Sequence, residues 1–202
     1  MDINEIIADI EDCFNYGDFD GIDKDIDLLL KQHSKDEVSK NLSTMILKNY
    51  TIHKSDFLAK VMEVIIRKSP DLAMIKHPEN YLFKTSVITG SNDLYECYIE
   101  EAAEPALVNS QPQKKEHFYM ELYNIAQNIT EQFYTDYKQY RKGTHYNGAF
   151  KDYEKNENIV LLAKEDYQVM NDLAEKYNAI IGRKDIVNDL SKRAGLDPEA
   201  YE

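Results

Sequence analysis

The run VMEVII at Val61–Ile66 is followed 33 residues later by LYECYI at Leu94–Ile99. Each run precedes a charged stretch with a proline, RKSPDL after the first run and EEAAEP after the second. A period of this length is typical of proteins built from stacked helical hairpins. Stacks of this kind usually bind other macromolecules. The spacing therefore predicts an all-α fold of stacked antiparallel helical hairpins.

The second copy of this pattern carries further detail. Within residues 80–105, a helix with small residues leads to a glycine turn and then to a helix that ends in paired apolar residues. Ser86–Val87 stand where ankyrin repeats have two alanines, Gly90 stands at the turn glycine, and Tyr98–Ile99 stand at the paired leucines. The segment therefore resembles about one ankyrin-type repeat, which implies a helical-repeat fold. Antiparallel helical hairpins of another kind would produce the same pattern.

The N-terminal residues predict another hairpin. Apolar residues recur at helical spacing from Ile3 and again from about Ile22. Gly17 between them is a suitable left-handed cap, and Asp18 or Asp20 is a suitable N-cap for the second helix. Further along the chain, serines are expected to cap two helices, Ser55 before Phe57 and Ser91, or its neighbour Asn92, before Leu94.

The clearest loop is VNSQPQ at residues 108–113, which divides the chain into a hairpin-repeat region (1–108) and a C-terminal helical region (113–202). We expect the second region to pack on the first as one unit. It begins with a long helix ending at Gly143, whose apolar stripe is Phe118, Leu122, Ile125, Ile129, Phe133, Tyr137 and Tyr140. A helix over about 159–181, ended by Gly182, and a short helix capped by Gly195 complete this region.

Composition limits the partners of this chain. The 202 residues have a formal net charge of −13 and a pI near 4.8, so the chain as a whole repels phosphate backbones and anionic membrane surfaces. We therefore expect neither nucleic acid nor membrane as a partner, and instead a protein with a basic surface. Cys13 and Cys97 are expected to be buried free thiols. With no basic, apolar N-terminal leader and no long apolar run, a cytoplasmic location is expected.

Two groups of residues are candidates for partner binding. Residues 1–30 contain ten acids and one lysine, so they hold −9 of the net charge. The candidates in this hairpin are Asp18, Asp20, Asp23, Asp25 and Asp27. The second group lies in an aromatic cluster and consists of Tyr119, Tyr123 and Tyr134, which stand off the centre of the apolar stripe. Tyrosine is enriched at protein interfaces, although plain packing would explain the cluster equally well.

No motif for catalysis, metal binding or a cofactor stands out. The acids of 18–27 do not match the spacing of a calcium-binding loop, the histidines form no ligand pair, and no phosphate-binding glycine loop is present. We therefore predict no metal, no cofactor and a non-enzymatic role. The expected function is an inhibitor or adaptor that masks a basic surface, of the immunity, antitoxin or anti-defence type. The alternatives are a helical hydrolase or nuclease with an unrecognised site, and a structural oligomer subunit.

Overall fold

The computed structural model describes residues 2–51, 54–73, 80–143, 179 and 181–196. Within these residues the chain is helical and has no strand, so the predicted all-α class is confirmed. The last helix of the described chain covers residues 181–193. The preceding elements are α1 (Ile3–Tyr16), α2 (Phe19–Gln32), α3 (Lys35–Asn49), α4 (Ser55–Lys68), α5 (Pro70–Ala73), α6 (Tyr81–Thr89), α7 (Asn92–Tyr98), the π-helix η2 (Ile99–Ala103), α8 (Glu104–Leu107) and α9 (Pro112–Gly143).

Local signals in the sequence fix several helix ends. Asp2 caps α1 and Glu5 accepts a hydrogen bond from the Asp2 backbone N–H at 3.0 Å, which closes a capping box. Gly17 ends this helix in the predicted left-handed conformation, with a φ of 70°. Asp18 then caps α2 by accepting a hydrogen bond of 3.0 Å from the backbone N–H of Gly21. Gly17 and Asp18, which both lie in the loop, therefore determine the turn of the first hairpin.

The start of α4 differs from the prediction. Ser55 is the first residue of α4, and the N-cap is Lys54, which makes no side-chain capping bond. The Ser55 hydroxyl is instead hydrogen-bonded to the Ser91 hydroxyl, 36 residues away. Ser91 also caps α7, as predicted, by accepting from the backbone N–H of Leu94 at 3.2 Å. A contact between helices therefore replaces the local cap expected for Ser55.

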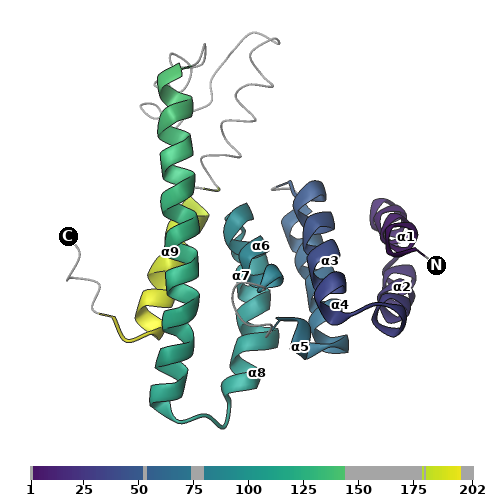
Figure 1. Ribbon diagram of the computed structural model, residues 1–202, viewed down its shortest axis with the longest axis horizontal. Helices are drawn as coiled ribbons and strands as arrows, with labels where there is room; N and C mark the ends of the chain where they lie inside the picture. Colours follow the sequence, from purple (N-terminus) through teal and green to yellow (C-terminus); the bar gives the residue numbers. More distant parts are fainter. Residues whose placement is uncertain (1, 52–53, 74–79, 144–178, 180, 197–202) are drawn as a thin grey trace.

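The helices lie in layers along the long axis of the molecule (Figure 1). The hairpin of α1 and α2 forms one end and contacts α3 and α4. In the middle, α3 packs on α6 and α4 packs on α7. The long helix α9 contacts α6 and, with the helix at 181–193, forms the other end (Figure 1).

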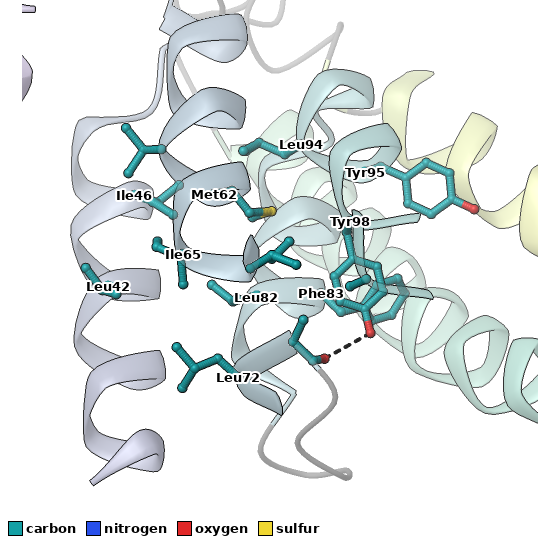
Figure 2. Packing of buried hydrophobic residues seen from close by; sticks show 14 of the residues in the cluster. Leu42, Ile46, Met62, Ile65, Leu72, Leu82, Phe83, Leu94, Tyr95 and Tyr98 are labelled. Carbon is teal, nitrogen blue, oxygen red and sulfur yellow. Dashed lines mark hydrogen bonds between the residues drawn. The ribbon is translucent and has the colours of Figure 1, made fainter. Parts of the chain in front are cut away.

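One apolar core runs through these layers. Leu42, Met62, Ile65, Leu82 and Phe83 are completely buried. In Figure 2, Met62, Ile65 and Leu82 lie among the core side chains, and Phe83 lies beside the Tyr98 ring. Removing one such side chain from water contributes about 1.5–3 kcal/mol. One polar group within this core, the hydroxyl of Tyr98 on α7, has two hydrogen-bond partners.

Tyr98 is buried, and its ring centroid lies 5.2 Å from that of Phe83. Its hydroxyl donates to the backbone oxygen of Ala73 at 3.1 Å and accepts from the side-chain amide of Asn80 at 3.0 Å (Figure 2 shows the first bond). Burial raises the pKa of Tyr98 above its ordinary value. These bonds tie α7 to α5 and to the start of α6.

The C-terminal region agrees with the prediction at two ends and differs at one. α9 ends at Gly143, and Gly195 has a φ of 69° behind the last helix, both as predicted. Gly182 was expected to end a helix over 159–181, yet it lies inside the helix at 181–193. A Cβ atom on Gly182 would lie 1.8 Å from the backbone oxygen of Gly90, so glycine is needed here for close packing. Residues 159–178 of that predicted helix lie outside the described residues.

Candidate functional site

The candidate site is built on the helical path from α7 through η2 to α8. The π turn arises where Pro105, which has no backbone N–H, interrupts the α-helical bonding pattern. The backbone N–H of Glu104 bonds to the oxygen of Ile99, five residues earlier. Single π turns inside α-helices occur often at functional sites. Here the π turn lies among acidic side chains at four-residue spacing.

We call Asp93, Glu96 and Glu100 the acidic ridge. All three side chains are exposed, and no cation in the described part of the chain pairs with them. Glu96 and Glu100 are four residues apart on one helical path, where like charges destabilise a helix by about 0.2–0.5 kcal/mol. The ridge therefore keeps a locally unfavourable charge arrangement at the surface.

A groove of about 300 Å³ lies on one side of the ridge, toward the helix at 181–193. Its floor holds Tyr95, whose hydroxyl donates to Asp189 Oδ2 at 2.6 Å. Arg193 Nε donates to the same oxygen at 2.6 Å, and its Nη1 donates to Glu104 Oε1 at 3.0 Å. The Arg193 guanidinium also lies 5.6 Å from the centroid of the Tyr119 ring. This network joins α7, α8 and α9 to the last helix.

The ionisation of this network follows from its geometry. Burial, and then the Asp189 carboxylate, raise the pKa of Tyr95, which stays neutral and donates its proton to the hydrogen bond. The hydrogen bonds from Arg193 to Asp189 and Glu104 outweigh the cost of burial and raise the pKa of Arg193. The hydrogen bonds of Tyr95 and Arg193 therefore form a fixed support for the groove.

A second groove of about 350 Å³ lies on the other side of the ridge, toward α4. A ladder of ion pairs crosses it: Glu63 accepts from Lys60 and Arg67, both at 2.8 Å, and Arg67 reaches Glu101 at 3.0 Å. Cys97 lines the same groove and donates a hydrogen bond of 3.3 Å to the backbone oxygen of Ala59. Burial, with Glu63 and Glu101 nearby, raises the pKa of Cys97 to about 12, so this thiol is not an activated nucleophile.

The two grooves and the ridge between them form one acidic surface. Their walls carry nine carboxylates and three basic side chains. The carboxylates are Asp56, Glu63, Asp93, Glu96, Glu100, Glu101, Glu104, Asp185 and Asp189, and the basic residues are Lys60, Arg67 and Arg193. Glu96 and Glu100 line both grooves. A cationic side chain placed in either groove is therefore attracted by the same ridge.

Several of the hairpin acids predicted as a docking face make contacts with other residues of the same chain. Asp18 caps α2, while Asp23 and Asp27 accept from Lys68 Nζ at 2.9 and 2.8 Å. Asp25 is half-buried, and burial together with Asp9 and Asp18 raises its pKa. Asp20 is exposed, and no ion pair to it is present in the described part of the chain. The hairpin docking site stays a prediction, and Asp18, Asp20 and Asp23 are its exposed members.

The tyrosines predicted for partner binding lie in different surroundings. Tyr119 is buried, with its ring centroid 5.7 Å from that of Phe118. Tyr123 is half-buried against the apolar core. The side chain of Tyr134 lies outside the described residues. Of these tyrosines, Tyr119 faces the groove network, with its ring centroid 5.6 Å from the Arg193 guanidinium.

Sequence reasoning did not find the ridge. The charge count pointed to residues 1–30, where acids are dense along the chain. The ridge and its grooves collect acids from α4, α7, η2, α8 and the last helix, so their density appears only in three dimensions. The spacing of Glu96, Glu100 and Glu104 by four residues was the signal available in the sequence.

No known protein family, curated protein or solved structure is significantly similar to this chain. Among the described residues, no helix combines the length and apolar character needed to cross a bilayer. Likewise, no three His, Cys, Asp or Glu side chains in the described part of the chain converge as metal ligands would.

Proposed function

We propose that this protein binds another protein and masks a basic surface on it, as an inhibitor or adaptor of the immunity, antitoxin or anti-defence type. The observation that carries the proposal is the acidic ridge, in which Asp93, Glu96 and Glu100 are exposed without a cationic partner among the described residues. A lysine or arginine of the partner would supply the missing charge in either groove. Electrostatic attraction of this kind raises association rates and sets specificity.

The scaffold suits this role. The buried Tyr98 holds α7 to the core through its hydrogen bond to Ala73. The network of Tyr95, Asp189 and Arg193 holds the same helix to the helix at 181–193. A rigid surface binds with a smaller loss of conformational entropy than a mobile one. The backbone that carries the ridge is therefore held in place before the partner arrives.

We further propose that the middle of the chain is a stack of antiparallel helical hairpins of the ankyrin-like kind. Two observations support this arrangement. α3 and α4 pack on α6 and α7, respectively, and Gly90 occupies the turn between α6 and α7 with a φ of 66°. Stacked hairpins commonly present such side-by-side helices to a partner.

Charge reversal separates the ridge from the hairpin as the binding surface. The ridge variant is E96K/E100K, and the matched control is D12K/D20K, which makes the same change in net charge at exposed positions of α1 and α2. Each tagged protein is used to capture proteins from cells of the source organism, and bound proteins are quantified by mass spectrometry. A basic protein captured by the wild type and by D12K/D20K, and lost with E96K/E100K, supports the proposal. Loss with D12K/D20K alone moves the binding surface to the first hairpin.

A further inference from the structure

Arg183, near the start of the helix at 181–193, is buried with unsatisfied hydrogen-bond donors. The residue is 4% exposed, and neither Nε nor Nη1 has an acceptor in the described part of the chain. The guanidinium lies 3.7 Å from the centroid of the Phe133 ring on α9, and this contact offsets only part of the cost of burial. Burial lowers the pKa of Arg183 to about 10, so the side chain is charged at neutral pH. A buried charge with unsatisfied donors disfavours the arrangement that buries it.

The other end of the same helix is tied to the fold by hydrogen bonds. Asp189 Oδ2 accepts from the Tyr95 hydroxyl and from Arg193 Nε, both at 2.6 Å, and Arg193 Nη1 donates to a carboxylate of α8 at 3.0 Å. The side chains of Ile186 and Leu190, further along the helix than Arg183, are buried. These contacts favour docking of the helix, so its two ends make opposing contributions.

The start of the helix also makes a close backbone contact. A Cβ atom on Gly182 would lie 1.8 Å from the Gly90 oxygen, so this end touches the turn after α6 directly. Packed interfaces of this kind change between discrete arrangements and do not deform continuously. A helix that leaves this contact is therefore expected to leave it as a unit.

We propose that the helix at 181–193 opens from the rest of the fold as a unit while α3, α4 and α6 stay packed, so that a minor population of the protein has this helix undocked. The unpaired Arg183 favours release, because water satisfies its donors in the open form. The hydrogen bonds of Asp189 and Arg193 favour the docked form. Local opening in such cooperative units requires less free energy than global unfolding.

Opening of this helix regulates the acidic surface. Asp185, Asp189 and Arg193 line the groove on the last-helix side of the ridge, so this groove is complete only in the docked form. The groove toward α4 is lined by no residue of the last helix and is kept in both forms. A partner that uses the first groove therefore holds the helix docked. This consequence rests on the proposed function, whereas the opening itself does not.

The test is hydrogen–deuterium exchange of the full chain at pH 7 without a partner, measured by mass spectrometry of peptides. After correction for intrinsic rates, we expect the amides of 186–193 to exchange at least about tenfold faster than those of 60–66 in α4. R183M should slow exchange in the last helix at least about threefold, because it removes the buried charge and keeps an apolar chain of similar length. R193M should speed this exchange at least about tenfold, because Asp189 and Glu104 lose their charged donor.

K192M is the matched control, since it makes the same replacement at an exposed position of the same helix, and it should change exchange by less than about twofold. The proposal is overturned if the last helix of the wild type exchanges as slowly as α4. It is overturned equally if R183M leaves exchange unchanged or speeds it, or if R193M has no effect. R183L is the second variant, and failure of both R183M and R183L to fold would show that the arginine supports docking, contrary to the proposal. Because no partner is added, each result is independent of the capture experiment that tests the proposed function.

Discussion

The Tyr95 hydroxyl donates a hydrogen bond of 2.6 Å to Asp189, a residue 94 positions later in the chain. The bond joins α7, which carries the acidic ridge, to the helix at 181–193. In Figure 2 the Tyr95 side chain points toward that last helix, whereas Tyr98 points into the core. The bond therefore joins the middle of the chain to its last described helix.

Removing this hydroxyl tests its contribution. Y95F should lower the free energy of unfolding by about 1–2 kcal/mol, because a carboxylate loses a donor in a part-buried site. Urea denaturation followed by circular dichroism measures the change. Y16F is the control, since Tyr16 is 87% exposed, and it should stay within about 0.5 kcal/mol of the wild type. Equal stability of Y95F and the wild type would show that the bond contributes nothing.

The same bond predicts a pH dependence. The folded state raises the pKa of Tyr95 above that of a free tyrosine, so the folded protein resists ionisation that the unfolded chain undergoes. The stability that Tyr95 contributes is therefore fully present below about pH 10 and is lost as the pH rises above that value. The difference in unfolding free energy between the wild type and Y95F should shrink from pH 9 to pH 11. A constant difference over this range would contradict the assignment.

Cys97 is expected to be unreactive in the folded protein. Its pKa is raised to about 12, so its thiolate fraction at pH 8 is far below that of a free cysteine. In a C13S background, iodoacetamide should modify folded Cys97 at least about tenfold more slowly than the urea-unfolded chain. Mass spectrometry of timed samples gives both rates. Similar rates in the two states would point to an activated thiol and revive the enzyme hypothesis.

Two glycines should respond differently to alanine. G182A should destabilise the protein by about 1–3 kcal/mol or more, because its Cβ atom would collide with the Gly90 oxygen. This loss would occur although alanine is the better helix former. G17A is the comparison, since Gly17 has a φ of +70° but open space around it, and its cost should be about 1 kcal/mol. If G182A is as stable as the wild type, the last helix does not press on the turn at Gly90.

Lys68 forms ion pairs with Asp23 and Asp27, and replacing it should change the pKa of Asp27. The hydrogen bond from Lys68 lowers the pKa of Asp27, so this pairing stabilises the fold above pH 3.8 and is lost as the pH falls through the lowered value. K68M should move the Asp27 pKa upward in an NMR titration of the side-chain carboxyl groups. K40M, which changes an exposed lysine on α3, should leave it unchanged. No difference between K68M and the wild type would mean that the pair does not persist in solution.

Features determined within one loop could be read from the sequence. The caps at Gly17, Gly90, Ser91 and Gly195 depend on neighbouring residues, and their conformations match the prediction. Ser55 could not be read in this way, because a hydroxyl 36 residues away determines its hydrogen bond. The helix around Gly182 was misplaced for a similar reason. A glycine that permits close packing looks the same in a sequence as a glycine that ends a helix.

The candidate site was harder to predict than the fold. Counting charges along the chain finds the first hairpin, where Asp18 caps α2 and Asp23 and Asp27 pair with Lys68. The acidic ridge needs the folded arrangement, because its grooves are completed by α4 and by the last helix. The burial of Arg183 also could not be predicted, because its guanidinium lies against the Phe133 ring of α9.

The measurement that tests the central claim most directly is the association rate of the captured basic partner as a function of ionic strength. Surface plasmon resonance would measure the association rates of the wild type, E96K/E100K and D12K/D20K at low and at physiological salt. If the ridge attracts the partner, E96K/E100K should slow association at least about tenfold at low salt and flatten its salt dependence, while D12K/D20K changes it far less. Equal rates and equal salt slopes for the wild type and E96K/E100K would contradict the account.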